Sequence, residues 1–179
     1  MCAERILMSY ANRMHIQIVR PATICGVSPR MRLDVVVNML TIRALVDGYI
    51  EVKTPDLYRP HCHIEDVTDL YMFMLERPYL CGPYNAGFDN QTIMQTAVSI
   101  AEEVGCEVRT APNVAGKYDK RSYLVDSERI LREGFRPRFG VKEAIKNIVG
   151  MYRLGALRDE DQCYNLKWMM QHGWVDGTR

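Results

Sequence analysis

The stretch HIQIVRPATICGVSPRMR, residues 15–32, decides the fold, because it predicts a buried strand that leads into a loop. Ile16, Ile18 and Val19 form a short β-branched run, which is typical of a strand inside a sheet. Pro21 ends this run, since proline has no backbone N–H to donate. The glycine and proline that follow indicate a loop.

A long helix is predicted next, over residues 33–46. Its apolar residues recur on one side (Val36, Val37, Leu40 and Ala44), and Asp47 followed by Gly48 is a typical C-terminal helix signal. YIEV, residues 49–52, then predicts a second short strand. Strand, loop, helix and strand therefore follow one another in close succession, as in an α/β unit.

The alternation continues along the chain. Helices are predicted to begin near Glu65, at Asn90 or Thr92, at Asp126 or Ser127 and at Val141, and strands are predicted at 83–87 and 106–111. Glu65 and Asp66 are interpreted as first-turn carboxylates that cap their helix, whose core stripe is expected to be Val67, Leu70, Tyr71 and Met74. Residues 113–120 are predicted to form a loop, and the tail 159–174 a further helix. Such a pattern predicts an α/β fold with parallel strand pairs.

The opening residues, MCAERILMSY, predict a helix that has no N-cap ahead of it. Its apolar residues have the spacing of a core-facing stripe (Ala3, Ile6, Leu7, Tyr10 and Ala11). A helix that packs against a core normally has a capped beginning. We therefore expect its start to lie in sequence that precedes this chain.

Composition limits the classes of function. The 179 residues contain 23 Lys and Arg against 22 Asp and Glu, so no global basic field attracts nucleic acid or an anionic membrane. The six cysteines are single, without a C-x-x-C pair, and the chain has neither a signal-peptide pattern nor an apolar run of about 18 residues. These features favour a cytoplasmic protein.

No motif by itself identifies a cofactor or a metal. The sequence has no G-x-G-x-x-G fingerprint and no P-loop. His61, Cys62 and His63 are adjacent on a predicted extended segment, so their side chains alternate between faces, and we interpret them as packing and capping residues rather than zinc ligands. Composition and spacing alone predict only an α/β domain.

Four stretches, in this order, resemble the extended short-chain dehydrogenase/reductase family, the NAD-dependent epimerases and dehydratases that act on nucleotide sugars. They are VRPATICG (19–26), YRPHCHIEDV (58–67), YNAG (84–87) and YDKRSYLVDSERILREGFRP (118–137). Each stretch is short, but their order and spacing make the resemblance specific. It covers nearly the whole chain and corresponds to the C-terminal half of the family.

The resemblance implies an α/β architecture: the C-terminal part of a Rossmann-type, NAD(P)-binding parallel sheet together with the small substrate-binding domain. Residues 1–32 would hold the last helix and strand region of the Rossmann core, and residues 33–179 mainly the substrate-binding domain with returning core strands. The glycine-loop half and the catalytic Tyr-x-x-x-Lys pair are expected upstream of Met1. We therefore assign no catalytic residue and no metal site to this chain.

The family loop beside the nicotinamide ring matches Pro21 to Gly26. The resemblance implies that Pro21, Ala22, Thr23 and Ile24 form one wall of a site for NAD or NADP, shared with the missing half. Without the resemblance, Pro21 would be read as a strand end and Gly26 as a turn residue.

The resemblance assigns four residues to the nucleotide-sugar ligand. Asn38 would lie near the diphosphate, although a helical Asn is more often bonded locally. Arg59 and Arg121 would donate paired hydrogen bonds to the phosphates, the alternative for each being a surface ion pair. Tyr123 would stack on or hydrogen-bond to the nucleotide, or pack as a partly buried Tyr.

Neighbouring residues receive other interpretations. His63 and Asp66 form an H-x-x-D entry to a helix and are interpreted as structural. Arg30 and Arg32 would lie near the mouth of the substrate cleft, either holding an acidic ligand or exposed to solvent. Tyr49 and Lys53 have the spacing of the catalytic pair but lie in a predicted strand, so we discount them.

Two functional hypotheses follow. In the first, the chain is the nucleotide-sugar-binding portion of an NAD(P)-dependent epimerase, dehydratase or reductase and is inactive alone. In the second, it is a non-catalytic nucleotide-binding or partner-binding module. A separately encoded N-terminal half is a candidate partner. Family members often pair through the Tyr-x-x-x-Lys helix, of which only the end would be present here, so homodimer formation stays open.

Overall fold

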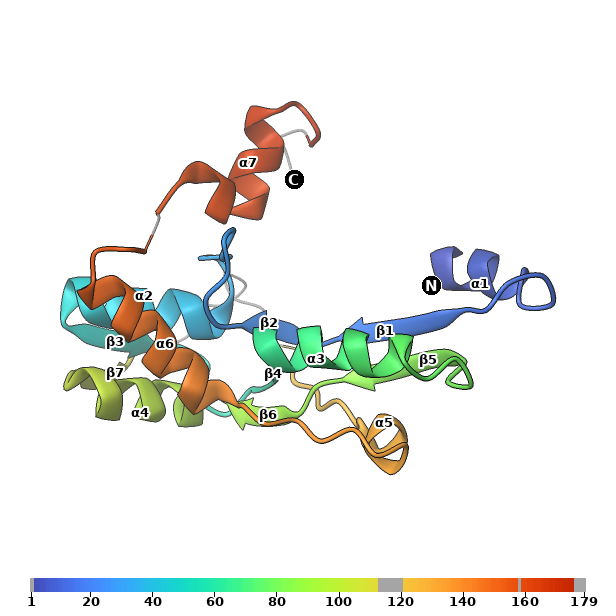
Figure 1. Ribbon diagram of the computed structural model, residues 1–179. Helices are drawn as coiled ribbons and strands as arrows, with labels where there is room; N and C mark the ends of the chain where they lie inside the picture. The colour runs from blue at the N-terminus through green and yellow to red at the C-terminus, as the bar shows by residue number, and fades with distance from the viewer. Residues whose placement is uncertain (1, 113–120, 158, 176–179) are drawn as a thin grey trace.

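The computed structural model describes residues 2–112, 121–157 and 159–175 (Figure 1). Its helices are α1 (Cys2–Met8), α2 (Val36–Asp47), α3 (Ile64–Leu75), α4 (Ile93–Val104), α5 (Glu128–Arg132), α6 (Val141–Arg153), the 3-10 helix η1 (Asp161–Cys163) and α7 (Asn165–Gln171). Its strands are β1 (Gln17–Pro21), β2 (Thr23–Cys25), β3 (Tyr49–Val52), β4 (Tyr58–His63), β5 (Gly82–Ala86), β6 (Asp89–Thr92) and β7 (Glu107–Thr110).

The described strands pair in three groups. β1 lies parallel to β5, with Val19 opposite Tyr84, and β3 lies parallel to β7. β4 is the central strand of the third group: it runs parallel to β2 and antiparallel to β6. Parallel neighbours joined through helices confirm the predicted α/β fold class.

The main hydrophobic core lies where α2, α4 and α6 pack together with β3 and β7, at one end of the molecule (Figure 1). The buried side chains of this cluster are Cys25, Val37, Leu40, Ala44, Ile50, Val52, Ala97, Ile100, Val141, Ala144, Ile145 and Val149. A second cluster joins α3 and α5 to β5 and is made of Leu70, Met74, Leu80, Tyr84, Ala86, Ile130 and Phe135. The space between the two clusters is spanned by β2, β4 and β6.

Local end signals explain where most helices begin and end. α2 stops at Gly48, which has φ of 75° and donates its N–H to the oxygen of Ala44, as the sequence predicted. Thr92, rather than Asn90, caps α4 and forms a capping box with Gln95. The cap of α3 differs from the prediction, because the His63 ring, and not a carboxylate, accepts the N–H of Glu65.

Two packing predictions were wrong. No residue of α1 is buried, and Ile6 in its expected core stripe is 62% exposed; Glu4 of this helix forms an ion pair with Arg20 of β1. Tyr71 on α3 is 49% exposed, because the buried face of that helix passes through Val67, Leu70 and Met74. The predicted loop 113–120 lies outside the described residues. Within those residues, no helix has the length and apolar character needed to cross a membrane.

Candidate functional site

A cavity of about 900 Å³ lies where β2 and β4 meet the N-terminus of α2. Four separate segments line it: Pro21–Ile24, Arg32 with Asp34–Val36, Arg59 with Pro60, and Arg121 with Tyr123 and Val125. The cavity therefore brings together seven of the eight candidate residues, since the four of the expected cofactor wall meet Arg59, Arg121 and Tyr123. Asn38 is the exception and does not line it. We call this cavity the arginine pocket.

The wall formed by Pro21–Ile24 is fixed because the chain passes there from one strand to the next. β1 ends at Pro21, and the N–H of Ala22 donates to the oxygen of Ala86 at 2.8 Å. β2 begins at Thr23 and lies parallel to β4, with Thr23 opposite His61. The segment thus presents small side chains and backbone to the cavity from a rigid position.

Arg59 is the most strongly constrained cation of the arginine pocket. Its side chain comes from the first half of β4, and the residue is only 8% exposed. Nη1 donates to the oxygen of Tyr58 at 2.9 Å and to the oxygen of Arg121. Its guanidinium carbon lies 5.6 Å from the ring centroid of Tyr123, within the range of a cation–π contact. The guanidinium is therefore held by backbone oxygens and an aromatic ring while it lines the cavity.

Long-range hydrogen bonds hold the segment that carries Arg121 and Tyr123 against the strands. The Oγ of Ser122 accepts the N–H of Tyr58 at 3.0 Å. The side chain of Asn90 brackets Val125: its Nδ2 donates to the Val125 oxygen at 3.1 Å, and its Oδ1 accepts the Val125 N–H at 3.0 Å. A segment without regular structure thereby gains the fixed position that a binding wall needs.

The glycine of YNAG lets this segment approach closely. A Cβ added to Gly87 would lie 2.8 Å from the Cβ of Val125 and 3.1 Å from that of Ala22, closer than ordinary contacts permit. The backbone of Gly87 also donates its N–H to the Oγ of Ser127 at 2.9 Å. Only glycine fits between two walls of the arginine pocket at this point.

Asn38 has a different position from the one suggested by the resemblance. It is 2% exposed, its Oδ1 accepts the N–H of Gly26 at 3.2 Å, and its Nδ2 donates to the oxygen of Arg32 at 2.8 Å. Gly26 has φ of 108°, a conformation that favours glycine. In this structure Asn38 fastens the two ends of the loop between β2 and α2, and its assignment as a ligand residue remains untested.

The N-terminus of α2 adds backbone donors to the cavity. Val35 and Val36 line it, and the N-cap Val35 has no side chain that could satisfy the first N–H groups of the helix. The positive end of the helix dipole thus lies beside Arg32, Arg59 and Arg121. An anion with several oxygens, such as a diphosphate, is the ligand that this arrangement favours.

His63 and Asp66 have structural roles. The Nδ1 of His63 accepts the N–H of Glu65 at 3.1 Å, and Asp66, which is fully buried, accepts the N–H groups of Arg138 and Phe139. Burial raises the pKa of Asp66, and the two backbone donors oppose that rise. Burial lowers the pKa of His63. His63 therefore caps α3, and Asp66 joins α3 to the segment at 138–139 rather than capping the helix.

His61 is a buried base whose ring nitrogens have no hydrogen-bond partner among the described residues. The residue is 1% exposed. Burial lowers its pKa to about 4; the charge of Asp89 opposes this effect and that of Arg59 adds to it. A neutral imidazole at neutral pH leaves Arg59 as the cation on this strand.

Sequence reasoning missed the backbone donors of α2 and the role of Asp34. Asp34 lines the cavity, and its carboxylate accepts from Arg32 Nε at 2.9 Å. The only local signal was a carboxylate just ahead of an uncapped apolar helix start. Ser122 and Asn90 act through long-range bonds that no local pattern could reveal.

Fold and site together define an α/β protein with a cavity lined by three arginines and the N-terminus of a helix. No known protein-family model matches the chain. Solved structures do: UDP-glucose 4-epimerase of Thermus thermophilus in complex with NAD shares 26% identity with a TM-score of 0.68, over 87% of this chain and 52% of its own. UDP-N-acetylglucosamine 4-epimerase of Bacillus cereus matches with 18% identity and a TM-score of 0.72, over 90% and 54% of the two chains.

A third neighbour is RMD of Pseudomonas aeruginosa complexed with NADPH, at 16% identity and a TM-score of 0.71, covering 86% of this chain and 54% of that one. The chain thus spans about half the length of the solved structures that it resembles. These neighbours confirm the resemblance of the chain to the C-terminal half of the extended short-chain dehydrogenase/reductase family.

Proposed function

We propose that the chain is the nucleotide-sugar-binding portion of an NAD(P)-dependent epimerase, dehydratase or reductase, and that its 179 residues do not catalyse turnover by themselves. The observation that carries this proposal is the arginine pocket. There, Arg59, Arg121 and the N-terminus of α2 line one cavity with the Pro21–Ile24 wall. Planar guanidinium groups and backbone N–H groups suit the oxygens of a nucleoside diphosphate.

Each wall has its own task in this proposal. Arg59 and Arg121 would neutralise and orient the diphosphate, and Tyr123 would cover an adjoining ring by stacking. Asn38 would influence the diphosphate site by holding the loop to which it is hydrogen-bonded, and its direct contact with the ligand stays a prediction. The sugar would extend toward the Pro21–Ile24 wall.

The cofactor would share this pocket with residues outside the chain. Pro21–Ile24 offers small side chains and backbone, which fit one face of a flat ring, but the sequence contains no glycine-rich loop for a pyrophosphate. NAD or NADP, when bound, supplies a hydride acceptor and donor. This chain's residues would form one wall of that site and hold the substrate against it.

We further propose that an N-terminal dinucleotide-binding half packs beside β1. Among the described strands β1 pairs only with β5, so its other edge has no strand partner there. Exposed apolar residues lie on the two helices that contact β1, α1 through the Glu4–Arg20 ion pair and α3 by packing: Ile6, Leu7 and Met8 on α1, and Tyr71, Met72 and Leu75 on α3. An unpaired parallel edge with apolar side chains nearby suits another layer of α/β structure. The half could belong to the same polypeptide or to a separate one.

The six cysteines are spread singly along the sequence without a C-x-x-C pair, which favours a reducing compartment, and we place the protein in the cytoplasm on that basis.

The proposal is tested by isothermal titration calorimetry of the full 179-residue chain with UDP-glucose, dTDP-glucose and GDP-mannose. We expect at least one to bind, and R121A to weaken binding about tenfold or more, as for loss of a charge-assisted hydrogen bond. Arg132, an exposed residue of α5 paired with Glu128, gives the matched control R132A, which should bind like the wild type. Failure of all three ligands to bind would overturn the proposal.

Catalysis is tested by adding or fusing the dinucleotide-binding half of a related epimerase, ending in Tyr-x-x-x-Lys. NAD(P)-dependent conversion of the bound nucleotide sugar is expected only in the reconstituted protein. If the reconstituted protein binds both NAD(P) and the nucleotide sugar but does not convert it, the non-catalytic binding module is favoured. The added half is needed for this test because the sequence itself contains no Tyr-x-x-x-Lys pair in a helix.

A further inference from the structure

The C-terminal segment is fastened to the loop that leads into the arginine pocket. The N–H of Leu33 donates to the oxygen of Cys163 at 2.9 Å, and the N–H of Asn165 donates to Asp34 Oδ2 at 3.1 Å. Arg30 Nη2 adds a bond to the side-chain oxygen of Asn165 at 3.0 Å. Residues far apart in the sequence thus meet directly ahead of α2.

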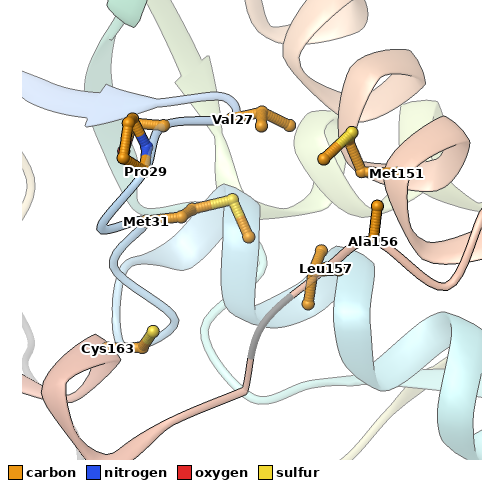
Figure 2. A pocket seen from close by; sticks show the side chains of 8 residues that line it. Val27, Pro29, Met31, Met151, Ala156, Leu157 and Cys163 are labelled. Atoms are coloured by element: carbon orange, nitrogen blue, oxygen red, sulfur yellow. The ribbon is translucent and has the colours of Figure 1, made fainter.

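Apolar residues of the two segments also meet at this junction. A cavity of about 480 Å³ lies there between the loop that carries Val27, Pro29 and Met31 and the C-terminal residues Leu157 and Cys163. Figure 2 shows the side chains that line it. Beside this cavity, Met31, Leu33 and Cys163 are buried in one hydrophobic cluster with Ile148, and Tyr164 packs against it. The hydrogen bonds of Leu33 and Asp34 add directional contacts that align the C-terminal segment with the loop.

Asp34 joins this segment to the arginine pocket. Its Oδ1 accepts from Arg32 Nε at 2.9 Å, and its Oδ2 accepts the N–H of Asn165. Arg32 and Asp34 both line the arginine pocket. Among the described residues, only the Nε of Arg32 is hydrogen-bonded, so the other guanidinium nitrogens can meet a ligand. One carboxylate thus holds a pocket arginine with one oxygen and the C-terminal segment with the other.

We propose that Asp34 is a positioning residue, which sets the Arg32 guanidinium at the wall of the arginine pocket and is itself held by the N–H of Asn165. This inference rests on the proposed function, since it assumes that the pocket binds a nucleoside diphosphate. Arg32 and Asp34 side chains are 46% and 26% exposed, so their ion pair adds little to stability. Asp34 orients the guanidinium, and a bidentate hydrogen bond to phosphate requires a defined orientation.

The main chain of Arg32 is fixed independently of Asp34. Asn38 holds the Arg32 oxygen from inside the fold, at 2.8 Å. Loss of the Asp34 carboxylate should therefore release the Arg32 side chain while the loop stays in place. Variants of Asp34 should fold, and their effect should appear in ligand binding.

A double-mutant cycle tests whether Asp34 acts through Arg32. D34A and R32A should each weaken UDP binding about threefold to tenfold, as for partial loss of one charged hydrogen bond. D34A should have little further effect in the R32A background, because the two residues act as a unit. Both variants should weaken UDP more than uridine, whereas a general folding defect would weaken both ligands alike. Independent effects in the cycle would overturn the proposal. D34N keeps one accepting oxygen and replaces the other with an NH2 group, which cannot accept, so it should give a smaller loss than D34A.

Asn165 allows a second test with a matched control. It is the first residue of α7, a position that tolerates proline, and Tyr164 before it is extended (φ −117°, ψ 97°) rather than in the α conformation that a following proline disfavours. N165P removes the N–H that Asp34 accepts, while N165A keeps it. N165P should weaken UDP binding about twofold to fivefold, and N165A less than about twofold.

The outcomes separate the two proposals. If the wild-type chain binds neither UDP nor a nucleotide sugar, the proposed function fails. If it binds UDP and N165P matches N165A, or D34A matches the wild type, the positioning role of Asp34 fails alone. Thermal unfolding of each variant, followed by circular dichroism, verifies that it is folded in the binding experiment.

Discussion

Arg59 donates a hydrogen bond from Nη1 to the backbone oxygen of Arg121, so two of the three arginines of the arginine pocket are connected through the side chain of one and the main chain of the other. The same nitrogen also donates to Tyr58. Arg59 therefore lines the cavity and also holds the segment that carries Arg121 in place.

This connection predicts different effects for the two arginines. R59K should lower the free energy of unfolding by about 1–3 kcal/mol, since a lysine replaces a planar donor that bonds two backbone oxygens in part-buried contacts. R121A leaves the accepting backbone oxygen in place, so it should weaken ligand binding with little loss of stability. Urea unfolding and calorimetry on both variants test this difference. Equal stability of R59K and wild type would contradict it.

Gly87 is predicted to tolerate no larger residue while Val125 stays in place. G87A should destabilise the protein by about 1–3 kcal/mol, because the added Cβ would lie 2.8 Å from the Cβ of Val125. The double variant G87A/V125A does not remove that Cβ, whereas G87A/V125G does. Recovery of stability in the second but not the first, measured by urea unfolding, is the expected pattern. No recovery in either would show that the backbone, and not this contact, requires glycine.

Acid should destabilise the protein through His61. Its folded pKa of about 4 lies below the value of about 6.5 for an unfolded chain, so the unfolded state binds more protons between these values. Stability should therefore fall as the pH is lowered through this window, by roughly 2 kcal/mol at pH 5 from this residue. The lowered pKa of His63 acts in the same direction. The raised pKa of Asp66 has the opposite sign, because its folded form retains a proton more readily.

H61F isolates the contribution of His61. Phenylalanine keeps an aromatic ring in the buried site and cannot be protonated. The free energy of unfolding of H61F minus that of the wild type should therefore become more positive as the pH falls from about 7 to about 5. Chemical unfolding at several pH values measures it. A difference that is constant with pH would show that His61 does not titrate in this way.

Local signals made much of the fold predictable. Gly48 ends α2 and Thr92 caps α4 through residues within four positions, so a pattern in the sequence contains the whole interaction. The first turn of α6, by contrast, is capped by Asp89, which accepts the N–H of Val141 at 3.0 Å across 52 positions. Contacts of this kind depend on the tertiary fold, so a short sequence pattern does not predict them.

The same difference between local and long-range interactions applies to the candidate site. Arg59 could be predicted because it lies in a motif beside buried strand residues, and the resemblance to a family gave it a role. Asn38 was assigned to the ligand on the same ground; it bonds Gly26 and Arg32 in this structure, and its ligand role stays a prediction. The choice between a ligand and two backbone groups depends on where a helix side chain points relative to a distant loop, and the sequence does not contain that information.

The exposed apolar face of α3 gives the last prediction. Met72 and Leu75 are 54% and 71% exposed, and α3 packs against β1. If a dinucleotide-binding half covers this face, M72K and L75K should leave the free energy of unfolding of the chain within about 0.5 kcal/mol, as for surface substitutions, but should weaken reconstitution with that half. Val46 is 63% exposed and lies on α2, a helix of the main hydrophobic core, so V46K is the matched control and should reconstitute like the wild type. Pull-down of the added half, quantified for each variant, tests the proposal. Equal capture by M72K, L75K and V46K would show that the half, if it binds, does so elsewhere.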